Sequence, residues 1–212
     1  MKLLLLQIAD SAFPAGAFAH SGGLEALRQL GRLDGEATLA RRLEELAWHT
    51  AHAALPFLAS AHAAPAEAPA VDRACDVFLS NHVGNRASRA QGKAFLLAAE
   101  AMLGDAVTPL RSALPCGHLP VAFGAALAHL ELEEVRSVFL FGAVRNALSA
   151  AVRLGVVGPL RAQRVLLELH PVLDAALAAT KGLAAADASS TAPWLELAQA
   201  AHDRLYSRLF QS

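Results

Sequence analysis

Two groups of residues in the chain combine side chains that bind transition metals. Glu45, His49 and His52 follow the spacing i, i+4 and i+7, which places them on one face of a helix. Two imidazoles and a carboxylate could hold zinc or nickel, although such a spacing also arises by chance in a chain with 9 histidines. Cys116 and His118 form the second group, which fits a turn with a half-buried thiol better than a metal site. We therefore assign no metal ligand from the sequence and keep direct metal binding as an alternative.

The sequence lacks the patterns of phosphate chemistry and nucleophilic catalysis. A phosphate-binding loop needs a glycine-rich turn followed by Lys and then Ser or Thr. The segment 91–94 comes nearest, but Ala87 replaces its first glycine and Ala94 its hydroxyl. His20 and Ser21 are adjacent, so in a helix their side chains would point about 100° apart, and no strained nucleophile turn is present. The sequence predicts no enzymatic activity and no catalytic residue.

Composition indicates one large helical core. The chain has 212 residues, of which 55% are hydrophobic and 17% charged, and a formal net charge of −1. A balance so close to zero, without a long run of one sign, provides no field to attract a nucleic-acid backbone. Alanine and leucine dominate while aromatic residues make up 6%, which favours helices over strands. We expect a single domain over residues 1–212 that does not bind nucleic acid.

The apolar stretches do not have the composition of membrane-spanning helices. Residues 112–130 lack Asp, Glu, Lys and Arg but contain prolines, glycines and histidines. The apolar run over 138–157 is interrupted by Arg145 and Arg153, whereas a spanning helix needs about 20 apolar residues with few charges. We therefore expect no membrane association.

The first residues of the sequence and the number of cysteines favour a cytoplasmic location. Residues 1–6 imitate a secretory signal, but Gln7 and Asp10 break the apolar segment too early. Cys75 and Cys116 are the only cysteines in the sequence, and their number fits free thiols better than a disulfide framework. The sequence thus predicts a cytoplasmic protein.

Helix periodicity and Pro/Gly punctuation predict an all-α fold of about ten helices. Residues 64–70 contain two prolines and are expected to form a surface loop, and 104–118 a connection. The helix over 134–155 is apolar nearly all round and should lie at the centre of the core. The last helix should carry an apolar stripe from Trp194 to Leu205. The expected helices cover residues 2–9, 19–30, from 36 onward, 71–82, 86–103, 119–132, 134–155, 160–180 with a break at Pro171, and from Pro193 onward.

Both chain ends have unusual compositions. Residues 13–25 contain one proline, three glycines and two phenylalanines, which fits a tight corner between helices. The terminus 206–212 carries Tyr, Arg, Leu and Phe where a frayed, polar end is typical. This tail either folds back on its own core or presents an interaction hot spot.

Four sequence blocks together resemble the UreF family of urease accessory proteins. Residues 13–25 are similar to its hallmark L-P-x-G-x-[FY]-x-x-S-x-G-L-E, and 88–94 to its central S-R-x-x-G helix. Residues 118–124 resemble its H-x-P-V-A-F-G helix start, and 206–212 its Y-S-R-L-F-R-S terminus, with Gln211 in place of Arg. The hallmark positions matched in the first block include Pro14, Gly16, Ser21, Gly23 and Leu24.

This resemblance implies a non-enzymatic, helical, homodimeric adaptor. Such a protein would bind the accessory protein UreD, also called UreH, and recruit the GTPase UreG to apo-urease. No cofactor would be bound stably, because nickel would be handled by the complex. The alternative is a metallochaperone that binds nickel directly, through Glu45, His49 and His52 or through Cys116 and His118.

The resemblance also assigns residues to two surfaces. Glu25 and Arg153 would face the GTPase. Tyr206, Arg208, Leu209 and Phe210 would dock on UreD/UreH. A charged patch would set orientation and association rate, while the aromatic and Arg residues of the tail would supply affinity.

Overall fold

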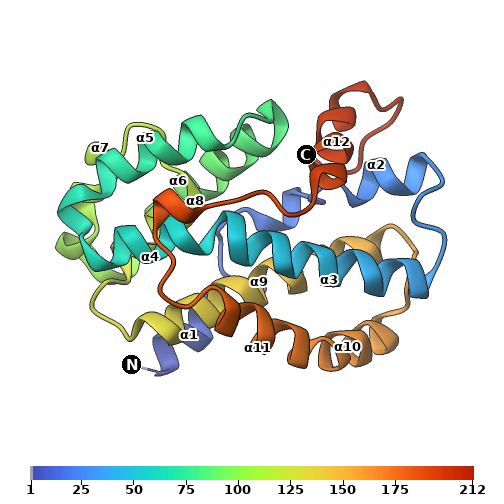
Figure 1. The fold of residues 1–212 in the computed structure, drawn as a ribbon, viewed down its shortest axis with the longest axis horizontal. Coiled ribbons are helices and arrows are strands. Elements are labelled where there is room, and N and C mark those ends of the chain that lie inside the picture. Colours follow the sequence, from blue (N-terminus) through green and yellow to red (C-terminus); the bar gives the residue numbers. More distant parts are fainter. Residues whose placement is uncertain (1) are drawn as a thin grey trace.

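The computed structural model describes residues 2–212, which form helices and no strand (Figure 1). This confirms the all-α prediction, and ten of the α-helices have eight residues or more. Short 3-10 turns occupy Ala17–Ala19, Pro65–Glu67, Gly104–Ala106, Ala185–Asp187 and His202–Arg204. The α-helices are α1 (Lys2–Ala9), α2 (Leu24–Gln29), α3 (Glu36–Ala53), α4 (Leu55–Ala63), α5 (Ala68–Phe78), α6 (His82–Leu103), α7 (Thr108–Ala113), α8 (Leu119–Ala126), α9 (Leu132–Arg153), α10 (Pro159–Glu168), α11 (His170–Ala179) and α12 (Pro193–Ala201).

Helix α9 is the centre of one half of the molecule, as its all-round apolar pattern predicts. It packs against α3, α1, α10 and α11, and α10 and α11 run along one edge of the fold (Figure 1). Leu140, Val144 and Leu148 are among its buried side chains. Among the described helices α9 alone is long and apolar enough to cross a membrane, yet half of its apolar window is buried inside the protein. These contacts identify α9 as a core helix.

The other half is built on α8, which packs closely against α4 and α6. Glycines make this approach possible. A Cβ at Gly124 would lie 3.0 Å from the carbonyl carbon of Leu58 and nearer still to its oxygen. A Cβ at Gly92 would lie 2.7 Å from the amide nitrogen of Leu119 and nearer still to the oxygen of Gly117. Backbone therefore meets backbone at both contacts, and only glycine fits there.

Several predicted boundaries are wrong, and prolines explain one of them. Residues 64–70 do not form a loop, because Pro65 begins a 3-10 turn and Pro69 lies in the first turn of α5. The first turn of a helix makes no use of the N–H that proline lacks, so proline starts helices as readily as it ends them. The connection 104–118 likewise contains the short helix α7, and the helix expected over 119–132 ends at Ala126.

The helix expected over 19–30 begins only at Leu24. Gly22 and Gly23 have φ angles of 62° and 91°, outside the helical region, and they separate the 3-10 turn from α2. At the other end of the chain α12 stops at Ala201. The predicted stripe is incomplete, because Leu197 is exposed and Leu205 lies in extended backbone beyond the helix.

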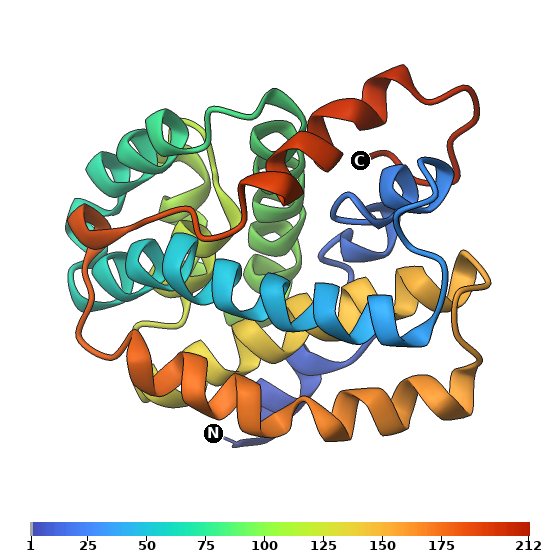
Figure 2. The ribbon, with the colours of Figure 1, turned by 45° about the vertical axis from the view of Figure 1, so that its right-hand side comes forward.

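The turn at residues 13–25 and the C-terminus meet on one side of the molecule. Figure 2 shows the C-terminus beside the N-terminal segment that leads into α2. The backbone N–H of Ser21 donates a hydrogen bond to the carbonyl oxygen of Ser212 at 2.6 Å. Two of the resembling blocks, 13–25 and 206–212, are thereby brought together.

Candidate functional site

The C-terminal tail, residues 205–212, folds back onto the N-terminal turn. The amide of Gln211 donates to the oxygen of Ala19 at 2.7 Å, and the Ser21 hydroxyl donates to the oxygen of Ser212 at 3.0 Å. A ring nitrogen of His20 lies 2.6 Å from the Ser212 hydroxyl oxygen. The backbone of the tail is therefore folded back on the protein, while the interaction role of its side chains stays a prediction.

A buried carboxylate holds this tail in place. Glu25, in the first turn of α2, is only 2% exposed. Its oxygens accept the backbone N–H of Leu209 at 2.6 Å and of Phe210 at 3.2 Å. The third contact is the ring Nε2 of His202, at 3.1 Å and fully buried. A buried carboxylate requires such partners, so Glu25 acts as a clamp on the tail and does not itself face solvent.

Arg153, the last residue of α9, supports the same arrangement from the other side. Its guanidinium lies over the ring of Phe18 at 3.7 Å and over the ring of Phe210 at 4.2 Å. It also donates a hydrogen bond to the oxygen of Phe18 at 2.6 Å. Cation–π contacts of this kind contribute about 0.5–2 kcal/mol each. The two residues predicted to face the GTPase thus both contact the tail.

The tail divides its side chains between the interior and the surface. Phe210 is buried and anchors the segment. Tyr206 is fully exposed, Leu209 is 55% exposed, and Arg208 is half exposed beside Asp203. We call Tyr206, Arg208 and Leu209 the tail face. It presents an aromatic, an apolar and a cationic side chain on a segment whose backbone is fixed.

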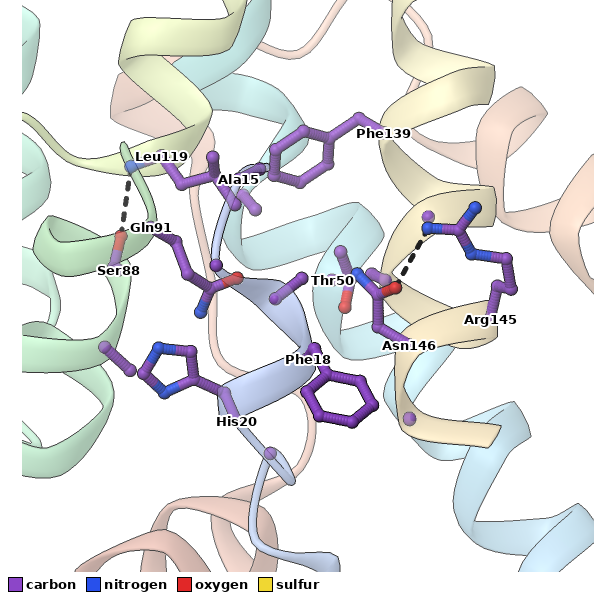
Figure 3. Close-up of a pocket in the computed structure, with 18 of the residues that line it drawn as sticks. Ala15, Phe18, His20, Thr50, Ser88, Gln91, Leu119, Phe139, Arg145 and Asn146 are labelled. Carbon is purple, nitrogen blue, oxygen red and sulfur yellow. Dashed lines mark hydrogen bonds between the residues drawn. The ribbon is translucent and has the colours of Figure 1, made fainter. Parts of the chain in front are cut away.

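A cavity of about 560 Å³ lies beneath the N-terminal turn (Figure 3). It is mainly apolar and is bounded by the turn, α3, α6, α8 and α9. In Figure 3 Phe18 and His20 approach it from the turn, and Asn146 lies opposite on α9. Burial lowers the pKa of His20, so the neutral imidazole is favoured there. The turn that carries the hallmark residues therefore spans a hollow on its inner side.

The hallmark residues shape the entry into α2. Pro14 and Gly16 lie in the turn above the cavity, and Ser21 is buried against the last residue. A Cβ on Gly23 would come within 3.3 Å of Gln199 on α12, so its absence permits close packing. Leu24 begins α2 and is buried in the core.

Of the two candidate metal groups, the structure assembles only the one around Cys116. Among the described residues, one group of His, Cys, Asp or Glu brings three ligand atoms within 4.8 Å of one another, namely Asp76, Cys116 and His118. Glu45, His49 and His52 form no such group. The carboxylate of Glu45 pairs with Arg42 at 2.7 Å, and the ring of His52 contacts the oxygen of Trp48 in its own helix at 3.0 Å.

Electrostatics leave both thiols protonated. Burial, followed by the carboxylates of Asp72 and Asp76, raises the pKa of Cys116, and the same causes raise that of Cys75. Burial lowers the pKa of His118, whereas hydrogen bonds from Asn85 and His118 lower the pKa of Asp76. Because the nucleophile of cysteine chemistry is the thiolate, neither cysteine is poised as a nucleophile.

Acidification is expected to weaken the fold through three histidines. Burial is the largest cause of a lowered pKa at His20, His49 and His118. The unfolded chain then binds protons that the folded chain excludes, so the free energy of unfolding decreases as the pH falls through the unfolded value of 6.5. Urea titrations between about pH 7.5 and about pH 5.5 would check this, and H49Q should flatten the slope. A midpoint that does not change with pH would contradict the expectation.

Comparisons with known proteins point to one family. The family model described as UreF matches residues 33–170. Urease accessory protein F of Arabidopsis thaliana is 34% identical over 97% of this chain and 90% of its own length. Urease accessory protein UreF of Trichodesmium erythraeum is 31% identical over 99% of this chain and 96% of its own length. The chain belongs to the UreF family.

The four blocks that carry the UreF resemblance assemble into two spatial pairs. The N-terminal turn and the tail are joined by the hydrogen bonds of Ser21 and Glu25. The blocks 88–94 and 118–124 meet where Gly92 lets α6 approach the start of α8, and Ser88 contacts the ring of His118 at 3.1 Å. The sequence motifs of this UreF-family chain therefore mark two contacts between distant segments.

Sequence reasoning missed the residues that complete these contacts. His202 contacts Glu25, but its position in the sequence reveals no such role. Phe18 lies under Arg153, and its place at the [FY] position of the hallmark was an available signal. Asp72 and Asp76 are spaced i, i+4 on α5, and this pair of carboxylates on one helix face was an available signal.

Proposed function

We propose that the chain is a non-enzymatic adaptor in urease maturation, which binds UreD/UreH through the tail face and recruits the GTPase UreG to apo-urease. The observation that carries this proposal is the clamped tail, whose backbone is fixed by Glu25 while Tyr206, Arg208 and Leu209 remain accessible. Membership of the UreF family supports the link to urease, since the matched relatives are named urease accessory proteins.

The tail face has the properties of a hot spot. Tyr and Arg are enriched among the residues that dominate binding energy, where they fill well-packed pockets of the partner. Because the tail is already ordered by its clamp, docking costs less conformational entropy than docking of a free terminus. The buried Phe210 orders the segment, and the exposed residues make the contact.

The GTPase is proposed to dock near Arg153 and Phe18. Phe18 is largely exposed and lies under the guanidinium of Arg153, so the two side chains form an aromatic and cationic patch beside the tail. The buried Glu25 would not contact the GTPase itself and would act by holding the tail beside the Arg153 and Phe18 patch. UreG and UreD/UreH would therefore occupy neighbouring faces of one assembled site.

Removal of the exposed side chains tests the docking role of the tail. The double variant Y206A/L209A should weaken binding to UreD/UreH by about thirtyfold or more, which is the effect of losing a hot spot, and should leave the thermal midpoint unchanged. L197A removes another exposed leucine from α12 and is the matched control, with binding expected to stay normal. Wild-type affinity in the double variant would refute the assignment. Truncation of the tail is less informative, because it also removes the buried Phe210.

Co-purification with UreD/UreH and UreG tests the adaptor role as a whole. Light scattering after size-exclusion chromatography should give a complex of all three proteins with two copies of this chain. The proposal places this assembly in the cytoplasm, with nickel as its cargo, no nucleic acid or membrane among its partners and no stably bound cofactor needed for docking. A monomer that binds neither protein would refute it.

A further inference from the structure

The segment that precedes α8 is organised around two carboxylates of α5. Asp72 is completely buried, and its oxygens accept the backbone N–H groups of Cys116, Gly117 and His118 at 2.7–2.9 Å. One turn later, Asp76 lies 3.1 Å from the ring Nε2 of His118. Three successive amides bound to one carboxylate fix the backbone of this loop. The side chains of Cys116 and His118 are thereby held on the same side as Asp76.

We propose that Asp76, Cys116 and His118 form a binding site for one divalent transition-metal ion of the zinc and nickel class. Their ligand atoms already lie within 4.8 Å of one another, and a tetrahedral site requires separations of about 3.5 Å. The partly exposed side chains of Asp76 and Cys116 can close this gap by rotating. A set of one sulfur, one nitrogen and one oxygen favours borderline ions over magnesium or calcium.

The charge of the three ligands and the access of solvent to them also fit a bound cation. A thiolate and a carboxylate together balance a divalent charge, and His118 contributes as a neutral imidazole. The thiol proton leaves to water when the sulfur binds the metal, and no electron is transferred. Asp76 lines a surface hollow together with Asn85 and Arg89, which gives an ion a route from solvent. The guanidinium of Arg89, 4.0 Å from Asp76, would move aside.

Ser88 supplies the second contact that a histidine ligand needs. In the metal-free protein the carboxylate of Asp76 can only accept, so the neutral ring carries its proton on Nε2 and Nδ1 accepts from Ser88. With Nε2 on the metal, the proton resides on Nδ1 and is donated to the Ser88 hydroxyl oxygen. A hydroxyl can play both roles by rotating, so the same residue orients the ring in either state.

Metal titration of the purified chain tests this site. Calorimetry with Zn²⁺ and, separately, with Ni²⁺ should give one ion per chain, and Co²⁺ should produce a thiolate-to-metal absorption band. C116S should abolish the band, and both C116S and D76N should weaken binding by at least about tenfold. Circular dichroism would confirm that the variants remain folded. These two positions are preferred to the fully buried His118, whose replacement risks unfolding.

The matched controls are the other cysteine and the other histidine group. C75A and H49A should bind the metal as the wild type does. The proposal fails if neither Zn²⁺ nor Ni²⁺ binds, if C116S retains the band or the affinity, or if C75A loses them. The site goes beyond the adaptor role and is independent of it. Metal binding is measured on this chain alone and docking on the complex with UreD/UreH, so failure of one is distinguishable from failure of the other.

Discussion

Replacing Glu25 with alanine is expected to release the C-terminal tail and to lower the free energy of unfolding by at least about 2 kcal/mol. The substitution removes the acceptor for the amides of Leu209 and Phe210 and for the ring of His202. Each buried donor left without an acceptor costs about 1–3 kcal/mol. The released amides regain hydrogen bonds to water, so the total stays below the sum of three losses.

Two measurements check this expectation. Urea unfolding gives the change in stability, and hydrogen exchange should show faster exchange at the amides of residues 209–211. Glu134, in the first turn of α9, provides the control E134A, which should leave the exchange of these amides unchanged because its carboxylate has none of these contacts. Loss of an acidic side chain from a helix N-terminus costs about 0.3–1 kcal/mol, so the change in stability should be smaller than in E25A. Unchanged exchange in E25A would show that Glu25 does not hold the tail. A released tail should also weaken binding to UreD/UreH, although Glu25 itself is buried.

Gly92→Ala is expected to produce the other large effect. Its Cβ would overlap the backbone of residues 117–119 at the start of α8, and backbone at that place cannot turn away as a flexible side chain does. Overpacking of this kind costs about 1–3 kcal/mol or more. The shift of the loop should also disturb the contacts of Asp72, and with them the geometry at Cys116 and His118.

Gly142→Ala is the matched control. Gly142 also lies within a 22-residue helix, and nothing is within 4 Å of a Cβ built there. Alanine in a helix interior is favoured over glycine by about 0.5–1 kcal/mol, so this variant should be more stable than the wild type. Thermal or urea unfolding of both variants measures their stability relative to the wild type. Equal stability of G92A and the wild type would refute the close approach.

The sequence predicts the helices better than the contacts between them. The apolar pattern of α9 correctly placed it in the core, because contacts with several other helices require apolar residues around one segment. The loop predicted from Pro65 and Pro69 is wrong, since proline is compatible both with a loop and with the first turn of a helix. Local patterns therefore identified most elements, with errors at their ends.

The candidate site could be predicted only in part. Resemblance drew attention to residues 13–25 and 206–212 but assigned them to separate surfaces. The buried state of Glu25 depends on His202 and on the tail amides, which are 177 to 185 positions away in the sequence. No local spacing encodes a contact over that distance. The metal group shows the same limit, because Asp76 joins Cys116 and His118 only through packing of α5 against α8.

The contact between the N-terminal turn and the tail has a consequence for the order of folding. His20 and Ser21 meet Ser212 across separations of 192 and 191 residues, so this contact cannot form before residues 20–212 have all been synthesised. Contacts of such range close late in folding, because the intervening chain must first become compact. The fixed arrangement of the tail face thus arises only after the residues between the turn and the tail have become compact. A partner that binds this face, as proposed above, would therefore distinguish folded molecules from unfolded ones.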